Sequence, residues 1–333
     1  MLFIFVPGEK LTILLIIILL FICLLLFKGT VTLHERLFTG LYNSAEFPED
    51  RFPPVDHNDF QKKVVEGYEY MRGVKVVICG LTKDDAPILP LTIARIEKTG
   101  GCFRDYRVIV YENDSRDRTP DILKNWQAVN TKVKIITESI QNSPIRQLSR
   151  TERLACFRNR YLRIIKESRE YADYDFVIVA DMDLKGGWSN DGIATSFARL
   201  DWDIVAANSI GYHNLRKTYY DMFALLPKNI FKTGLVYKIF GEGWQLHRGD
   251  PLIRIWSGFG GLAIYRKEAI MSRQYSGSIN GAIICEHIGL NADNSLRCFL
   301  NPSQITIAGT QEKKKYKSGS SWGNVLQKIF FNW

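Results

Sequence analysis

The sequence has few cysteines, and none of them is spaced for a metal or a disulfide framework. Its six cysteines are scattered over 333 residues, with no Cys-x-x-Cys pair and no zinc-finger spacing. This pattern argues against a structural zinc module and against a heavily disulfide-bonded secreted module. Internal repeats and low-complexity segments are also lacking. No nucleic-acid-binding motif accompanies the basic residues, so nucleic acid is not an expected partner.

The composition is that of a globular protein with a substantial core. Hydrophobic residues make up 46% of the chain, whose length suffices for one large α/β domain or two small ones. The 44 basic residues exceed the 35 acidic ones, which gives a formal charge of +9. This excess suits a polyanionic ligand or an anionic membrane surface. An ordinary soluble surface is the alternative.

One long hydrophobic run lies near the amino terminus. Residues 11–27 read LTILLIIILLFICLLLF without a charge, between two lysines. At about 1.5 Å per residue they would span roughly 26 Å, the short end of a bilayer crossing. The run lacks a following small-x-small cleavage site, which favours an uncleaved transmembrane helix over a signal peptide. The flanking lysines leave the orientation open.

Short apolar runs alternate with helical patterns over residues 74–207. Such alternation predicts the α/β class, with a mostly parallel sheet and helices on both faces. Ligands of such sheets bind at the carboxyl ends of the strands, so the residues at those ends become the candidates for a site. The predicted strands are 74–80, 107–111, 132–137, 176–180 and 204–207, and the predicted helices are about 89–98, 119–129 and 151–169.

Two carboxylates directly follow the fourth predicted strand. Asp181 and Asp183 stand after the wholly apolar run 176–180, where acidic residues are costly unless the strand has ended at a site. Mn²⁺ and Mg²⁺ prefer such oxygen ligands and keep open positions for phosphate oxygens. A solvated acidic pair is the alternative. The position of the two aspartates directly after an apolar strand favours a metal site, whose ion would bridge the diphosphate of a ligand.

Three ordered motifs resemble those of family-two-like GT-A glycosyltransferases. Residues 111–119 (YENDSRDRT) resemble the Asp-Asp-Gly-Ser-x-Asp-Gly-Thr turn of that family, and Arg-Asn-Arg at 158–160 is similar to its Ala-Arg-Asn. Asp-Met-Asp at 181–183 matches its Asp-x-Asp, in the same order. The likeness covers roughly residues 74–185. The Glu-Asn-Asp-Ser form also resembles fungal capsule-associated mannosyltransferases and related viral and bacterial proteins.

The resemblance implies a GT-A (Rossmann-like) fold and a nucleotide-diphosphate sugar as donor. It implies that Glu112 bonds the nucleobase, and that Asp117 faces the ribose or only holds the loop. Arg158 would lie near the donor phosphates, or be an exposed helix arginine. Asp181 would contact the donor and, with Asp183, bind Mn²⁺ or Mg²⁺; Asp183 is the stronger candidate for a direct ligand.

The second half of the chain offers a catalytic base. Glu286 and His287 follow the apolar run 282–284, and side chains of adjacent extended residues point opposite ways. By resemblance, Glu286 would be the base that deprotonates the acceptor, and His287 would complete the metal site. A surface glutamate and a satisfied histidine are the alternative. The glycine-rich stretch 256–265 lies near the donor sugar or is a plain turn into a strand.

The sequence thus predicts a metal-dependent glycosyltransferase acting on a glycan or a lipid-linked acceptor. The alternatives are a membrane-tethered carbohydrate-binding or inactive homologue and a sugar-nucleotide nucleotidyltransferase. By resemblance we expect a single-pass, type II membrane protein, of the Golgi or ER in a eukaryotic host or of the inner membrane in a bacterium. The predicted parts are an anchor (1–28), a stem (29–72), the catalytic domain (73–312) and a basic, aromatic tail (313–333).

Overall fold

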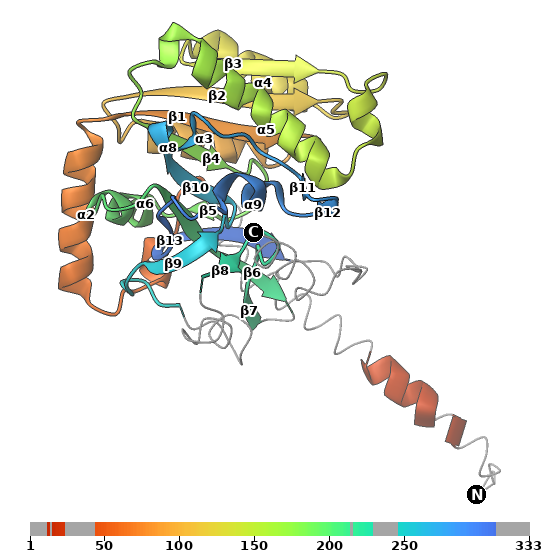
Figure 1. The fold of residues 1–333 in the computed structure, drawn as a ribbon. Coiled ribbons are helices and arrows are strands. Elements are labelled where there is room, and N and C mark those ends of the chain that lie inside the picture. Colours follow the sequence, from red (N-terminus) through yellow and green to blue (C-terminus); the bar gives the residue numbers. More distant parts are fainter. Residues whose placement is uncertain (1–11, 14, 24–43, 214–215, 229–245, 311–333) are drawn as a thin grey trace, which may run out of the picture.

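The computed structural model describes residues 12–13, 15–23, 44–213, 216–228 and 246–310. Apart from the short helical segment at 12–13 and 15–23, these residues form a mixed α/β domain, in which one sheet lies between helices (Figure 1). The predicted tail at 313–333 lies outside the described residues, as do most of residues 1–43.

The sheet is parallel in its first half and mixed beyond it. Within the described residues it has eleven strands in the order β3-β2-β1-β4-β10-β6-β13-β9-β8, with β7 beside β6 and β5 beside β13. β3, β2, β1 and β4 run parallel, β10 is antiparallel to both of its neighbours, and β6 and β13 are again parallel. The strands are β1 (Lys75–Thr82), β2 (Asp105–Asn113), β3 (Val133–Glu138), β4 (Phe176–Ala180), β5 (Gly187–Trp188), β6 (Ile204–His213), β7 (Arg216–Tyr219), β8 (Leu226–Pro227), β9 (Ile253–Ser257), β10 (Leu262–Arg266) and β13 (Cys298–Thr310), and a separate hairpin is formed by β11 (Ser278–Ile279) and β12 (Ala282–Ile283).

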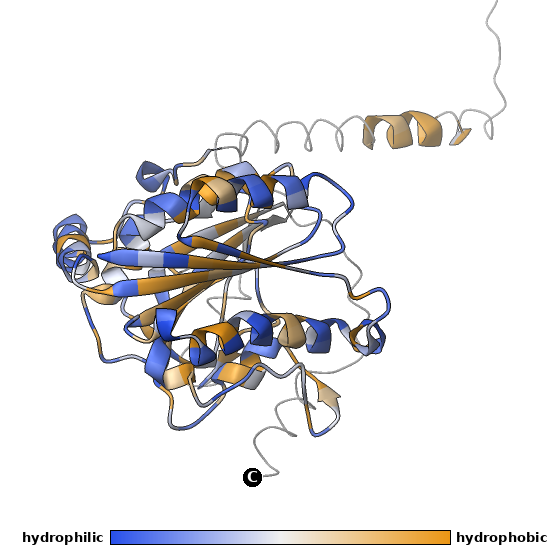
Figure 2. Cartoon of the chain, turned by 90° about the horizontal axis from the view of Figure 1, so that it is seen from above, coloured by the Kyte–Doolittle hydropathy of each residue, from blue (hydrophilic) through white to orange (hydrophobic). Residues whose placement is uncertain are grey.

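Helices cover both faces of this sheet, as the sequence predicts. The α-helices are α2 (His57–Met71), α3 (Leu89–Gly100), α4 (Thr119–Val129), α5 (Arg150–Glu167), α6 (Asn190–Phe197), α8 (Lys267–Ile270) and α9 (Glu286–Asn291), and the 3-10 helices are η1 (Glu49–Arg51), η2 (Pro144–Gln147) and η3 (Arg169–Tyr171). One core cluster joins α5 and α9 to one face, and the other joins α2, α3, α4 and α6 to the opposite face. Figure 2 shows the apolar residues gathered on the strands between the helical layers.

Local sequence signals account for the helix boundaries. Ser149 and Glu152 form a capping box at the start of α5, in which each side chain bonds the backbone amide of the other residue. Proline stands in the first turn of α3 and of α4, where its missing amide is not needed. The bounds of α4 and of β4 are those predicted from the sequence. The other predicted elements differ from the observed ones by a few residues at their ends, apart from the strand predicted at 204–207.

Two features differ from the expectation. The fifth predicted strand, 204–207, extends to His213 because β13 pairs with it along most of its length. The segment predicted as a stem contains α2, whose buried residues include Phe60 and Gly67, and η1. An added Cβ at Gly67 would lie 1.8 Å from the carbonyl oxygen of Ala194, so α2 packs in direct backbone contact with α6. The described residues 44–72 are therefore part of the packed domain.

The described part of the hydrophobic run is helical at residues 12–13 and 15–23, and its side chains are exposed. Among the described residues there is no helix of sufficient length and apolar character to cross a membrane. Residues 24–27, the end of the predicted transmembrane helix, lie outside the described residues.

Candidate active site

The carboxyl ends of β1, β2, β3 and β4 meet at one edge of the sheet, where the sequence predicts a site. The loops that follow β1 and β2 are joined by hydrogen bonds through their acidic residues. The amide of Arg116 donates to Asp84 Oδ1 at 2.6 Å, and the amide of Asp85 donates to the hydroxyl of Thr119 at 2.9 Å. This edge therefore has a fixed backbone, on which side chains can be held in place.

The acidic turn after β2 is closed by its own side chains. Glu112 is buried, and its Oε1 accepts the amide of Ser115 at 2.9 Å. Asp114 has a φ of +50° and accepts the Ser139 hydroxyl at 2.7 Å and the Ile140 amide at 3.0 Å. The turn is thereby tied to the loop after β3. Glu112 supports the shape of this turn, and whether it also contacts a nucleobase stays a prediction.

Asp117 holds two loops together. Its Oδ1 accepts the amide of Thr119 at 2.9 Å, and its Oδ2 accepts the amide of Ala86 at 3.0 Å. The hydroxyl of Thr119, followed by these amides, lowers the pKa of the Asp117 carboxyl. Because both oxygens already accept backbone hydrogen bonds, the geometry favours the loop-holding role over a direct contact with a ribose.

Arg158 lies buried at the centre of the candidate site, which is not the position of an exposed helix arginine. Its side chain is 5% exposed. Its Nε donates to Glu286 Oε1 at 3.0 Å, and its Nη2 lies 3.6 Å from Asp181 Oδ1. Its guanidinium also lies 5.1 Å from the ring centre of Phe259 and 5.9 Å from that of Tyr275. Arg158 thus connects a strand-end aspartate with the candidate base.

The two aspartates after β4 remain accessible. The side chain of Asp181 is 28% exposed, and its amide donates to the carbonyl of Gly261 at 2.8 Å. Asp183 is exposed. Burial, and then the neighbouring charge of Asp183, raise the pKa of the Asp181 carboxyl well above its ordinary value. The neighbouring carboxylate of Asp183 therefore disfavours ionisation of Asp181, an effect that a bound cation would offset.

Glu286 and His287 do not point opposite ways, because they begin α9 and are not extended. Both side chains are buried, and His287 Nε2 lies 3.7 Å from Glu286 Oε1. The imidazole stacks on Phe259 at 3.8 Å, and its Nδ1 shares a hydrogen bond with the hydroxyl of Tyr265 at 3.2 Å. Burial, and then the charge of Arg158, lower the pKa of His287 well below its ordinary value, so the ring is neutral at pH 7.

The geometry does not support His287 as a third metal ligand. In the described part of the chain, no group of three or more His, Cys, Asp or Glu side chains is placed to hold a metal ion. The ring of His287 is enclosed by Phe259 and Tyr275, and it approaches Glu286 rather than open solvent. Its Nε2 is buried without a hydrogen-bond partner among the described residues, so a metal-ligand role for His287 stays a prediction.

The structure adds Asp221, which the sequence analysis did not single out. This residue follows β7, and its Oδ2 accepts the amide of Gly260 at 3.1 Å. Its carboxyl has a pKa raised to about 6, chiefly by burial. The hydrogen bond from the Gly260 amide lowers this pKa, and the nearby charge of Glu286 raises it. The only sequence signal was an acidic residue directly before the mostly apolar run 222–226.

The glycine-rich stretch is the turn that connects β9 with β10 beside Asp181. Gly260 and Gly261 have φ values of +64° and +76°, and an added Cβ at Gly260 would lie 2.4 Å from the carbonyl oxygen of Ala207. Only glycine fits such a backbone. The turn therefore positions the amide of Asp181 and the carboxylate of Asp221 at the same place.

No protein-family model matches the sequence, and no curated protein matches it. Among solved structures, the chain is similar to the mannosyltransferase PcManGT from Pyrobaculum calidifontis in complex with GDP-Man and Mn²⁺, at 14% identity and a TM-score of 0.42, over 78% of this chain and 66% of that one. It is similar to S. aureus TarS in complex with UDP-GlcNAc, at 14% identity and a TM-score of 0.43, over 74% and 62%. It is also similar to GalNAc-T7 with UDP, GalNAc and Mn²⁺, at 10% identity and a TM-score of 0.45, over 74% and 46%. The chain spans between about half and two thirds of the length of these structures.

Proposed function

We propose that this chain is a metal-dependent glycosyltransferase, which moves a sugar from a nucleotide-diphosphate sugar to a hydroxyl of a glycan or a lipid-linked acceptor. The observation that carries the proposal is the connected group around Arg158. This buried cation lies 3.6 Å from the carboxylate of Asp181 and 3.0 Å from that of Glu286. A strand-end carboxylate and a candidate base are thus held together at the edge where parallel sheets bind ligands.

Asp181 and Asp183 are the residues that would hold Mn²⁺ or Mg²⁺. Their carboxylate oxygens are hard ligands, and both side chains reach solvent. Because burial and the charge of Asp183 raise the pKa of Asp181, a cation at this point would favour the ionised form of Asp181. The pair therefore fits the ion. A bound divalent cation would act as a Lewis acid on the donor diphosphate and offset the charge of the leaving group.

Glu286 is the proposed base. Arg158 Nε donates to Glu286 Oε1 and orients the carboxylate, while the hydrogen-bond partner of Oε2 among the described residues is the thiol of Cys285, at 3.7 Å. Oε2 would take the proton of the acceptor hydroxyl as the acceptor oxygen bonds to the anomeric carbon. The bond from that carbon to the phosphate oxygen breaks, and the nucleoside diphosphate leaves. Glu112 and Asp117 would support the nucleotide end through the loops that they hold.

The test is donor hydrolysis by the full chain in detergent, with Mn²⁺ or with chelator. The donors are GDP-mannose, UDP-N-acetylglucosamine and UDP-N-acetylgalactosamine, which correspond to the ligands of the similar structures. We expect chelator-sensitive release of a nucleoside diphosphate from one donor, and its loss in Asp183→Asn. Asp121→Asn is the matched control, because Asp121 is exposed on α4.

A second candidate is a membrane-tethered binding protein without turnover. The burial of Glu286, whose side chain is 5% exposed, favours this reading because a base must reach its acceptor. Calorimetry separates the two functions. Metal-dependent binding of a nucleotide sugar without hydrolysis or transfer would identify the binding protein, whereas the absence of both binding and turnover would contradict both candidates.

We further propose that residues 11–27 attach the chain to a membrane in type II orientation. The support is a helical segment whose apolar side chains are exposed, among them Leu19 and Phe21, which are 64% and 62% exposed. Exposed apolar surface of this kind is costly in water. Flotation of the full chain with lipid vesicles, compared with a chain that lacks residues 11–27, tests the attachment. Equal flotation of the two chains would refute it.

A further inference from the structure

One segment of the described domain carries a large excess of positive charge. Between residues 139 and 169 the sequence has eight arginines and lysines and two glutamates, which is +6 of the formal +9. Most of this segment is α5. One of the eight, Arg158, faces the sheet and belongs to the candidate active site. The other seven stand elsewhere on α5 or in the residues beside it, and the proposed transfer reaction uses none of them.

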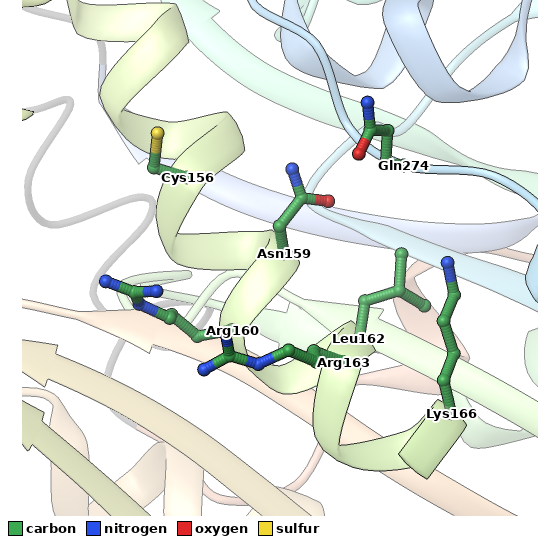
Figure 3. A pocket seen from close by; sticks show the side chains of 7 residues that line it. All are labelled: Cys156, Asn159, Arg160, Leu162, Arg163, Lys166 and Gln274. Carbon is green, nitrogen blue, oxygen red and sulfur yellow. The ribbon is translucent and has the colours of Figure 1, made fainter.

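Three of these cations line a hollow on the outer side of α5. The hollow has a volume of about 240 Å³, and its lining residues are Cys156, Asn159, Arg160, Leu162, Arg163, Lys166 and Gln274. Figure 3 shows the guanidinium groups of Arg160 and Arg163 at one side and Lys166 at the other. The floor is rigid, because Asn159 donates to the Tyr275 carbonyl at 2.9 Å and accepts the Tyr275 amide at 2.8 Å.

The cations of the hollow differ in their availability. Arg160 pairs with Glu138 at 3.2 Å, with both side chains about one third exposed. Lys166 donates to the carbonyl of Arg273. Arg163 is exposed, and no carboxylate of the described residues lies within ion-pair distance of it. The hollow therefore holds an uncompensated guanidinium, whose fork of donors suits phosphate or carboxylate oxygens.

We propose that this outer face of α5 binds the anionic groups, phosphate or carboxylate, of a polyanionic acceptor polymer. The inference rests on the proposed function for the existence of an acceptor. Arg153, Arg160, Arg163 and Lys166 extend over about 20 Å of helix at 1.5 Å per residue, which is the length of several charged repeats. The helix begins at the carboxyl edge of the sheet, so a polymer that lies along it leads towards the candidate active site.

A polymer fits this face better than a membrane surface does. The binding surface is hollowed, and it includes the amide of Gln274, which can bond sugar hydroxyls or phosphate. A bilayer presents a flat surface, and proteins that lie on it insert large apolar side chains. Among the described residues from 139 to 169, Leu148 is the one large hydrophobic residue that is markedly exposed, and it does not line the hollow.

The experiment measures binding of inorganic polyphosphate to the full chain in a neutral detergent, by calorimetry at several salt concentrations and with chelator present. We expect Arg163→Gln to weaken binding roughly threefold or more and to reduce the slope of log K against log salt by about 1. Arg163→Lys should restore most of the affinity. Arg72→Gln is the charge-matched control, because Arg72 is exposed at the end of α2 and does not line the hollow.

Three outcomes would overturn the proposal. The first is that the chain does not bind polyphosphate, and the second is that Arg163→Gln and Arg72→Gln weaken binding equally. The third is that Arg163→Gln loses binding to phosphatidylserine vesicles while its binding of polyphosphate is unchanged. The last outcome would identify an anionic membrane as the partner instead. Because the assay contains neither donor nor free metal, its result is independent of whether the chain hydrolyses a nucleotide sugar.

Discussion

Replacing Arg158 with methionine is expected to destabilise the folded protein by about 3–5 kcal/mol, the usual cost of removing one partner of a buried ion pair. The substitution would leave the carboxylate of Glu286, which is 5% exposed, with the weak Cys285 thiol at 3.7 Å and the neutral His287 as its nearest partners. Glu286→Gln is expected to cost less, about 1.5–3 kcal/mol, because Arg158 retains Asp181 at 3.6 Å and the ring of Phe259.

The assay is urea unfolding of the full chain in detergent, followed by tryptophan fluorescence. Arg163→Met is the control, since it removes an exposed arginine of the same helix and should change the unfolding free energy by no more than about 0.5 kcal/mol. The double variant Arg158→Met/Glu286→Gln should cost less than the sum of the single ones. The reasoning is refuted if Arg158→Met costs less than Glu286→Gln, or no more than the control.

Three further predictions concern packing and pH. Gly67→Ala should lower the unfolding free energy by about 1–3 kcal/mol, because the added Cβ meets the Ala194 carbonyl. Gly101→Ala is the control: the atom nearest to its added Cβ lies at 3.4 Å, so thermal unfolding should change little. Equal shifts in thermal unfolding of the two variants would contradict the α2–α6 contact. Burial raises the pKa of Asp105, but the hydrogen bonds and ion pairs of this carboxylate outweigh burial and lower the pKa to about 2. The carboxylate therefore stabilises the fold above pH 4. In urea titrations, Asp105→Asn should destabilise the protein by roughly 2 kcal/mol at pH 7, and this loss should shrink as the pH falls from 4 towards 2. Burial raises the pKa of Asp221 to about 6, so the ionised form of Asp221 opposes folding, and this penalty develops between pH 4 and 6. The change in unfolding free energy caused by Asp221→Asn should therefore be more favourable at pH 8 than at pH 4, by roughly 2 kcal/mol. A change that does not depend on pH would exclude this account.

Elements that depend on local signals were predictable from the sequence. The apolar run 176–180 and the Thr-Pro start at 119 give β4 and α4 their bounds, because a continuous apolar run and a proline in the first turn act within a few residues. The sheet order beyond β4 was not predictable in this way. β10 lies between β4 and β6 although β9 precedes it in the chain, and that placement depends on pairing between distant segments.

The candidate site was predictable at the level of residues and not at the level of contacts. The motifs located Arg158, Asp181 and Glu286, and the structure brings these three together. The burial of Arg158 could not be read from α5, whose sequence is rich in arginine on every side. The metal role of His287 was expected from the family resemblance, and the tertiary packing adds that its ring stacks on Phe259 and its Nδ1 shares a hydrogen bond with Tyr265.

The acidic residues at the carboxyl edge divide into two kinds, and the division explains which of them can meet a substrate. Asp114 and Asp117 belong to the richest motif of the sequence, yet both oxygens of each already accept hydrogen bonds from neighbouring loops. A carboxylate in this state has little capacity left for a ligand and serves to shape the backbone. Asp181 and Asp183 accept no such hydrogen bonds in the described residues, and their mutual repulsion remains uncompensated except by Arg158. The proposed metal site therefore falls on this pair rather than on the motif-rich turn, because a bound cation would offset the effect of Asp183 on the ionisation of Asp181.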